Sequence, residues 1–174
     1  EKFYMVPVKN YLQPGTWVGL FNPTARRFLQ IHGSGIGCSG HFPLFAVLQD
    51  GHTYERFRVV DAGNGMVALH NHIFNRYVSM IWNGHAHVMT RSSESPDTSV
   101  ELPNGWADST AFVPVPINPN TNEIALWHPG HSRAVWMGGS GNVGVSRHVN
   151  AQDMNSGWVG ETFRVIPIPD PRIS

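Results

Sequence analysis

The sequence contains the same pattern of residues three times, and the copies together fill the chain. In each copy a leucine is followed seven residues later by an arginine: Leu20 and Arg27, Leu69 and Arg76, Leu126 and Arg133. A repeat of about 50 residues indicates one supersecondary unit used several times, and such units bury their apolar faces only against one another. The fold therefore has to be derived from the repeat, and the function from the places where the copies differ.

Each copy contains four short segments typical of β-strands, bounded by Gly, Asn and Pro, and no long apolar stripe of helical period occurs. The expected strands are 18–20, 28–31, 36–38 and 55–60 in the first copy, 67–69, 77–80, 85–89 and 110–115 in the second, and 124–126, 134–137, 143–145 and 161–166 in the third. Twelve strands in three copies predict an all-β fold, the β-trefoil. A β-propeller is the main alternative, but its blades usually number about four or more.

We expect a single β-trefoil domain over residues 1–174, with repeats at approximately 16–63, 64–119 and 120–169. The core is predicted at three sets of equivalent positions: Leu20, Leu69 and Leu126; Leu29, Val78 and Val135; Phe57, Phe112 and Phe163. Tight hairpin turns are expected at Ser34-Gly35, Asn83-Gly84 and Gly141-Asn142, where Gly or Asn tolerates a positive φ.

The second repeat carries a resemblance to known proteins. The segment Phe57-Arg58-Val59-Val60-Asp61-Ala62-Gly63-Asn64-Gly65-Met66-Val67-Ala68-Leu69, followed by Arg76-Tyr77-Val78-Ser79, resembles the fascin and hisactophilin class of β-trefoils. The resemblance implies the fold rather than a function. The chain departs from the ricin-type branch, because it has no Gln-x-Trp triplet, and from hisactophilin, because its loops hold fewer histidines. It is also poorer in lysine than actin-bundling surfaces normally are.

The charge composition argues against two classes of partner. Twelve basic residues balance twelve acidic ones, and only 14% of the residues are charged. Nucleic acids and anionic membranes reward clustered positive charge, so neither is expected as a partner, and no apolar run is long enough for membrane insertion. Cys38 is the single cysteine and excludes an intrachain disulfide. The localisation stays open: a soluble protein, cytosolic or secreted without disulfides.

The aromatic and histidine content points to glycan recognition. Six tryptophans, nine phenylalanines, four tyrosines and ten histidines occur in 174 residues. A sugar is bound by a flat ring that stacks on its apolar face and by Asn, Asp or His side chains that pair with its hydroxyls. We therefore predict a non-catalytic lectin that binds glycans or glycoproteins through loop residues: His70, Asn71, His72, Asn75, Trp82, Asn104, Trp106, Asp108, Trp127, His128, His131, Asp153, Asn155 and Trp158.

Structural roles compete with this interpretation. Trp106 and Trp158 recur with His52 at one position of the repeat, so they could instead close the bottom layer of the barrel. Trp17 and Trp136 are interpreted as packing residues, whereas Trp82 and Trp127 lie near turns and favour a binding role. The repeated arginines, Arg27, Arg76 and Arg133, are interpreted as structural, with guanidinium groups that satisfy turn carbonyls.

Catalysis, metals and cofactors are not expected. No catalytic motif, phosphate-binding glycine loop or dinucleotide fingerprint occurs, so the chain is not interpreted as an enzyme. His70 and His72, like His85 and His87, are two residues apart and share a strand face, but further ligands are missing. Neither a metal nor a cofactor is therefore predicted. Ten histidines would also make the chain cationic in mild acid.

A protein-binding trefoil is the alternative function. In that case the partner would be actin or a protease, and the polar stretch from Arg91 to Asp108 would be the protruding loop. A lectin predicts pockets of aromatic and Asn or Asp side chains, whereas a protein-binding trefoil predicts a charged or protruding surface. Ring-rich loops with few charges favour the lectin. Whether multivalency arises within one chain or through a homo-oligomer stays open.

Overall fold

The computed structural model describes residues 12–43, 48, 51–96 and 101–172. Four strands form in each repeat, in the predicted order, so the all-β prediction is confirmed. The first repeat contains β1 (Trp17–Asn22), β2 (Arg27–His32), β3 (Gly35–Cys38) and β4 (Phe57–Gly63). The second contains β5 (Met66–Asn71), β6 (Arg76–Trp82), β7 (His87–Arg91) and β8 (Val113–Asn118). The third contains β9 (Glu123–His128), β10 (Arg133–Met137), β11 (Val143–Val145) and β12 (Phe163–Ile168).

The first and fourth strands of the repeats build a closed six-stranded barrel. β1 pairs with both β12 and β4, β4 continues to β5, and β12 pairs with β9, which pairs with β8. Two main-chain hydrogen bonds of 2.8 Å between Val67 and Phe112 join β5 to β8 and close the ring. Closure leaves the barrel without an open strand edge.

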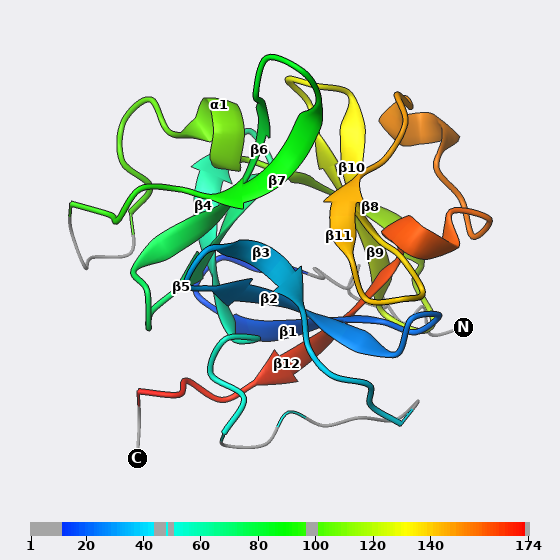
Figure 1. Cartoon of the computed structure of the whole chain (residues 1–174), viewed down its shortest axis with the longest axis horizontal. Coiled ribbons are helices and arrows are strands. Elements are labelled where there is room, and N and C mark those ends of the chain that lie inside the picture. The colour runs from blue at the N-terminus through cyan, green and yellow to red at the C-terminus, as the bar shows by residue number, and fades with distance from the viewer. Residues whose placement is uncertain (1–11, 44–47, 49–50, 97–100, 173–174) are drawn as a thin grey trace, which may run out of the picture.

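The remaining strands form three hairpins, β2–β3, β6–β7 and β10–β11. Their third strands, β3, β7 and β11, lie against one another and cap one end of the barrel (Figure 1). A barrel of six strands closed by three hairpins is the β-trefoil.

The core contains all nine residues expected from the repeat. The three leucines, the three residues at the second-strand position and the three phenylalanines are all fully buried and belong to one cluster. Each large apolar side chain buried in this way contributes roughly 1.5–3 kcal/mol. The threefold apolar pattern therefore corresponds to a threefold core.

The repeated arginines hold the ends of the third strands. Arg27 donates to the carbonyl of Ser39 at 3.0 Å, Arg76 to that of Ser92 at 2.8 Å, and Arg133 to that of Ser146 at 3.0 Å. In each repeat the hydroxyl of the same serine accepts a main-chain N–H of the second strand at 2.9 Å. The structural interpretation of the arginines is confirmed, and the serines are partners that the sequence pattern did not reveal.

Three local expectations were wrong. The fourth strands begin two or three residues later than expected, because short helical turns precede two of them: α1 (Ala107–Thr110) and η2 (Val159–Glu161). The third strand of the second repeat starts at His87, since Asn83 Oδ1 accepts the main-chain N–H groups of His85 and Ala86 and holds them in the turn. Gly84 and Gly141 adopt the expected positive φ, but Gly35 does not.

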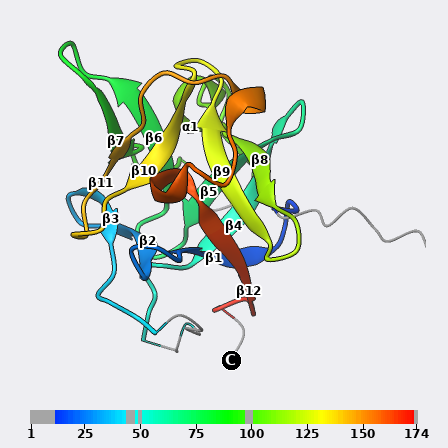
Figure 2. The same ribbon diagram turned by 90° about the vertical axis from the view of Figure 1, so that its right-hand side faces the viewer.

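The segment between β11 and β12 is the main irregular element of the third repeat. It contains the 3₁₀ turns η1 (Ala151–Asp153) and η2, which lie on the outside of the molecule beside β10 and β11 (Figure 1). Figure 2 shows η2 leading into β12 on the face turned toward the viewer. Within the described ranges, no helix is long and apolar enough to cross a membrane.

Candidate functional site

The loop after β11 places a tryptophan and an arginine face to face. Arg147 directly follows Ser146, which is buried and fixed by the hydrogen bonds described above, so the start of the loop is held by the barrel. Trp158 is positioned by a turn in which its main-chain N–H donates to the carbonyl of Asn155 at 3.0 Å. The guanidinium carbon of Arg147 lies 4.6 Å from the centre of the Trp158 ring. This distance is that of a cation–π contact.

Two open grooves meet at this pair of residues. The larger, of about 700 Å³, is lined by apolar and aromatic groups together with one acid, among them Trp136, Val145, Arg147, Trp158, Val159 and Glu161. The smaller, of about 490 Å³, is lined mainly by polar groups, among them Arg147, His148, Asn150, Asp153, Asn155 and Trp158. We call the larger the Trp158 groove and the smaller the Asp153 groove. Together they place flat rings beside hydrogen-bonding side chains, as a sugar site requires.

Glycines make room for the second ring of the Trp158 groove. A β-carbon on Gly160 would lie 2.5 Å from Nε1 of Trp136, and one on Gly138 would lie 2.7 Å from the edge of the same ring. Gly144 is paired with Trp136 across the β10–β11 hairpin and contributes no side chain over the ring. Trp136 was interpreted as a packing residue, and the structure places its half-buried ring in the lining of the groove.

Glu161 supplies a carboxyl group to the Trp158 groove. The residue is buried, with 8% of its surface exposed. Burial raises the pKa of this carboxyl above its ordinary value, while its own main-chain N–H and the charge of Arg147 act in the opposite direction. The groove thus combines an exposed cation with a buried acid.

Three of the residues nominated from the sequence come together here: Asp153, Asn155 and Trp158. The sequence reasoning missed Arg147, Trp136 and Glu161 as members of the same site. The one available signal was the Glu-x-Phe pattern before β12, which placed Glu161 at a fixed point of the repeat.

The nominated residues of the loop before β8 lie elsewhere. Trp106 packs edge-on against Tyr77, with ring centres 6.1 Å apart, and joins an apolar cluster with Val60 and Ala68. Its carbonyl accepts the hydroxyl of Thr110 at 2.7 Å. These contacts agree with a packing role for Trp106, the structural alternative to sugar binding. Asn104 and Asp108 are exposed on either side of it.

The nominated residues of the second repeat are engaged within the fold. Asn71 is fully buried and makes four hydrogen bonds to main-chain groups at 3.0–3.2 Å. His70 pairs with Asn75 Oδ1 at 2.8 Å, and burial lowers its pKa. Asn75 also adopts a positive φ and donates to the carbonyl of Ser95. His72 packs edge-on against Trp17, with ring centres 5.4 Å apart.

A row of rings occupies the boundary between the second and third repeats. Trp82 is 54% exposed, and its ring lies 4.9 Å from that of His87. His87 contacts His131 at 4.8 Å, and His131 stacks on His128 at 4.7 Å. Trp127 packs against an apolar cluster formed by Ala125, Ala134, Val149 and Met154, and its Nε1 donates to the carbonyl of Val149 at 2.9 Å. Within the described ranges, no set of three or more His, Cys, Asp or Glu side chains is arranged to hold a metal ion.

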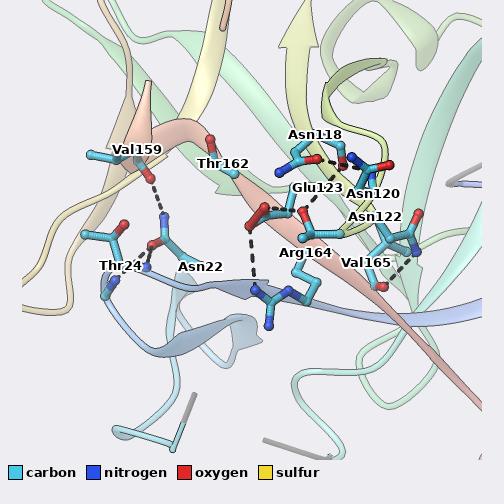
Figure 3. A network of polar contacts seen from close by, with 12 residues as sticks. Asn22, Thr24, Asn118, Asn120, Asn122, Glu123, Val159, Thr162, Arg164 and Val165 are labelled. Carbon is cyan, nitrogen blue, oxygen red and sulfur yellow. Dashed lines mark hydrogen bonds and ion pairs between the residues drawn. The ribbon is translucent and has the colours of Figure 1, made fainter. Parts of the chain in front are cut away.

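Asparagines at the barrel rim anchor the Trp158 groove to the first repeat. Asn22 donates to the carbonyls of Val159 and Gly160 at 3.2 and 3.1 Å, and its Oδ1 accepts the N–H of Thr24 (Figure 3). Beside this contact Arg164 lies 3.8 Å from Glu123, and Asn122 donates to the carbonyl of Val165. The bonds of Asn22 fix η2, and therefore one wall of the groove, to the turn after β1, and those of Glu123 and Asn122 hold the start of β12.

No protein-family model matches the sequence, and a search of curated proteins finds no match. Solved structures do match. A crystal structure of ThreeFoil, a designed 3-fold symmetric protein, has a TM-score of 0.59 and 12% identity and covers 87% of this chain and 99% of that one. The BEL β-trefoil in an apo crystal form has a TM-score of 0.66 and 8% identity and covers 94% of this chain and 100% of that one. At such low identity the likeness shows the fold alone, and the chain is a β-trefoil.

Proposed function

We propose that the protein binds glycans without catalysing a reaction, through the Trp158 and Asp153 grooves. The observation that carries the proposal is their common lining: Trp158, Arg147 and Asn155 border both. An indole ring offers a flat apolar surface, and the guanidinium and amide groups beside it offer donors and an acceptor to hydroxyl groups. Such a combination suits a sugar, whose ring has an apolar face and a polar rim.

A glycan array tests the proposal, with Trp158→Ala and Arg147→Ala run beside the unmodified protein. We expect binding to one class of sugar and its loss in both variants. Arg147 is exposed, so its variant should stay folded even if truncation of Trp158 loosens the cluster beneath it. Trp82→Ala is the matched control, because it removes an exposed indole that borders neither groove. Binding that survives both groove variants would contradict the proposal.

A protein partner is the second candidate, favoured by an exposed apolar surface formed by Tyr54, Ile73 and Phe74. Tyr54 and Ile73 are exposed, the rings of Tyr54 and Phe74 lie 5.0 Å apart, and Arg91 lies 5.7 Å from Phe74. Residues 97–100 of the loop suggested for such a role lie outside the described ranges. A blank array from well-folded protein would favour this candidate, and co-sedimentation with actin and protease inhibition assays would be the next measurements.

A further inference from the structure

The carboxyl group in the Trp158 groove has a counterpart in the first repeat. Glu55 precedes Phe57 by two residues, as Glu161 precedes Phe163, and both acids are buried, with 4% and 8% of their surfaces exposed. Glu55 Oε1 accepts a hydrogen bond of 2.8 Å from the side-chain amide of Gln30. The first repeat therefore provides a buried acid together with its donor.

The third repeat keeps the acid but replaces the donor. Gln30 follows Arg27 by three residues, and the residue at the same distance from Arg133 is Trp136. Among the described residues, no side chain takes the place of Gln30 as a hydrogen-bond donor to the carboxylate of Glu161. A carboxylate offers about four acceptor sites, and a ligand hydroxyl that donates to one of them replaces a bond that water would otherwise make. Glu161 borders an open groove, so such a ligand can reach it.

The charges around the groove restrict what that ligand can be. A ligand carboxylate or sulfate would face the buried Glu161, and a ligand ammonium would face the exposed guanidinium of Arg147. Like charges placed next to one another are unfavourable. A hydroxyl group can donate to Glu161 and accept from Arg147, so a neutral sugar satisfies both side chains.

We propose that Glu161 determines the specificity of the Trp158 groove by accepting hydrogen bonds from sugar hydroxyls, and that the groove selects neutral sugars over acidic and amino sugars. This inference rests on the proposed glycan binding. A site built to pair with a hydroxyl discriminates strongly against analogues that lack it, because its own polar group is then left unpaired.

The test compares Glu161→Gln with Glu55→Gln on an array of matched glycans. The array carries neutral galactose-, mannose-, glucose- and N-acetylglucosamine-terminated glycans, their sialylated, uronic and sulfated counterparts, and glucosamine with a free amine. We expect the unmodified protein to prefer the neutral members. Glu161→Gln should lower the affinity for these glycans about tenfold or more, because a charged acceptor is replaced by a neutral and weaker one, whereas Glu55→Gln should leave binding unchanged.

Deoxy analogues of the strongest neutral glycan provide a measurement that needs no variant. In the unmodified protein one deoxy position should weaken binding about tenfold, because it removes the donor to Glu161. Three results would overturn this inference and leave the proposed function standing: a preference for acidic or amino sugars, equal binding of every deoxy analogue, or unchanged binding by Glu161→Gln. A blank array would overturn both.

Discussion

At the residue scale, His128 is the clearest departure from the repeat. The equivalent residues Asn22 and Asn71 each hold their turn and a neighbouring loop by four hydrogen bonds. The ring of His128 is 1% exposed, and neither nitrogen makes a hydrogen bond to the described residues. Burial and the neighbouring His131 lower the pKa of His128 to about 4, although nearby main-chain carbonyls of Asp108 and Ser109 act in the opposite direction.

This residue should make the protein sensitive to acid. The unfolded chain takes up a proton at His128 near pH 6.5, and the folded chain only near pH 4. Between these values the unfolded state binds more protons, so the stability contribution is complete above pH 6.5 and is lost as the pH falls to 4. His128 should lower the free energy of unfolding by about 3 kcal/mol over this range. Denaturant titrations between pH 4 and 7 measure it.

The matched variants are His128→Asn, which restores the residue of the other repeats, and His85→Asn, which changes an exposed histidine. His128→Asn should reduce the drop by about 3 kcal/mol, and His85→Asn should leave it unchanged. An unchanged pH dependence in His128→Asn would show that other groups cause the loss of stability.

The candidate site was only partly predictable at this scale. Aromatic, amide and carboxylate residues between the third and fourth strands predicted Asp153, Asn155 and Trp158 as site residues, because sugar recognition uses such residue types. Arg147 and Glu161 could not be identified in this way. Their importance depends on the contact between Arg147 and Trp158 and on the position of Glu161 in the lining of the groove, and neither is visible without coordinates.

At the element scale, the serine that ends each third strand should contribute similarly to stability in all three repeats. In the third repeat the Ser146 hydroxyl accepts the N–H of Ala134 at 2.9 Å and donates to the carbonyl of Arg147 at 2.7 Å. Ser146→Ala leaves a buried N–H without an acceptor and should lower the free energy of unfolding by about 1–3 kcal/mol. Ser39→Ala and Ser92→Ala should cost similar amounts.

Chemical denaturation measures these losses, and Ser140→Ala is the control, because Ser140 is exposed in a hairpin turn. Ser146→Ala should also weaken glycan binding, since Arg147 follows directly. If Ser146→Ala were as stable as the Ser140 variant, the arginine–serine contacts would not hold the hairpins in place.

The 3₁₀ turn η2 should tolerate no side chain at Gly160. A β-carbon there would lie 2.5 Å from the Trp136 ring, closer than real contacts allow, so Gly160→Ala should displace the ring and reduce glycan binding about tenfold or more. Gly139→Ala is the control, because its β-carbon would meet nothing within 4 Å. Binding and tryptophan fluorescence measure the effect. Full affinity in Gly160→Ala would exclude Trp136 from the site.

At the scale of the whole molecule, the fold was predictable because it depends on what the repeats share. Leu20, Leu69 and Leu126 recur at equivalent positions, and three equivalent apolar faces close one barrel. The strand ends were less predictable. The segments before β8 and β12 form short helical turns, and their apolar and polar residues resemble those of the strands they precede. The groove was least predictable, because it depends on what the repeats do not share.

The differences between the three repeats predict one glycan site per chain. At the second-strand position after the repeated arginine, Phe28 and Tyr77 are replaced by Ala134, which leaves more room beside Trp158. Arg147 has Gly40 and Ser93 as its equivalents, and neither can stack on a ring. The first and second repeats therefore lack the combination that forms the Trp158 groove.

Isothermal titration with the strongest array glycan should give a stoichiometry near one per chain, and Trp158→Ala should abolish the signal. Protein that sediments as a monomer should not precipitate a multivalent glycoprotein, because cross-linking needs at least two sites in one particle. A homo-oligomer would precipitate it through sites on separate chains, so the sedimentation measurement has to accompany the assay. A stoichiometry near three, or precipitation by the monomer, would mean that the first two repeats bind glycans as well.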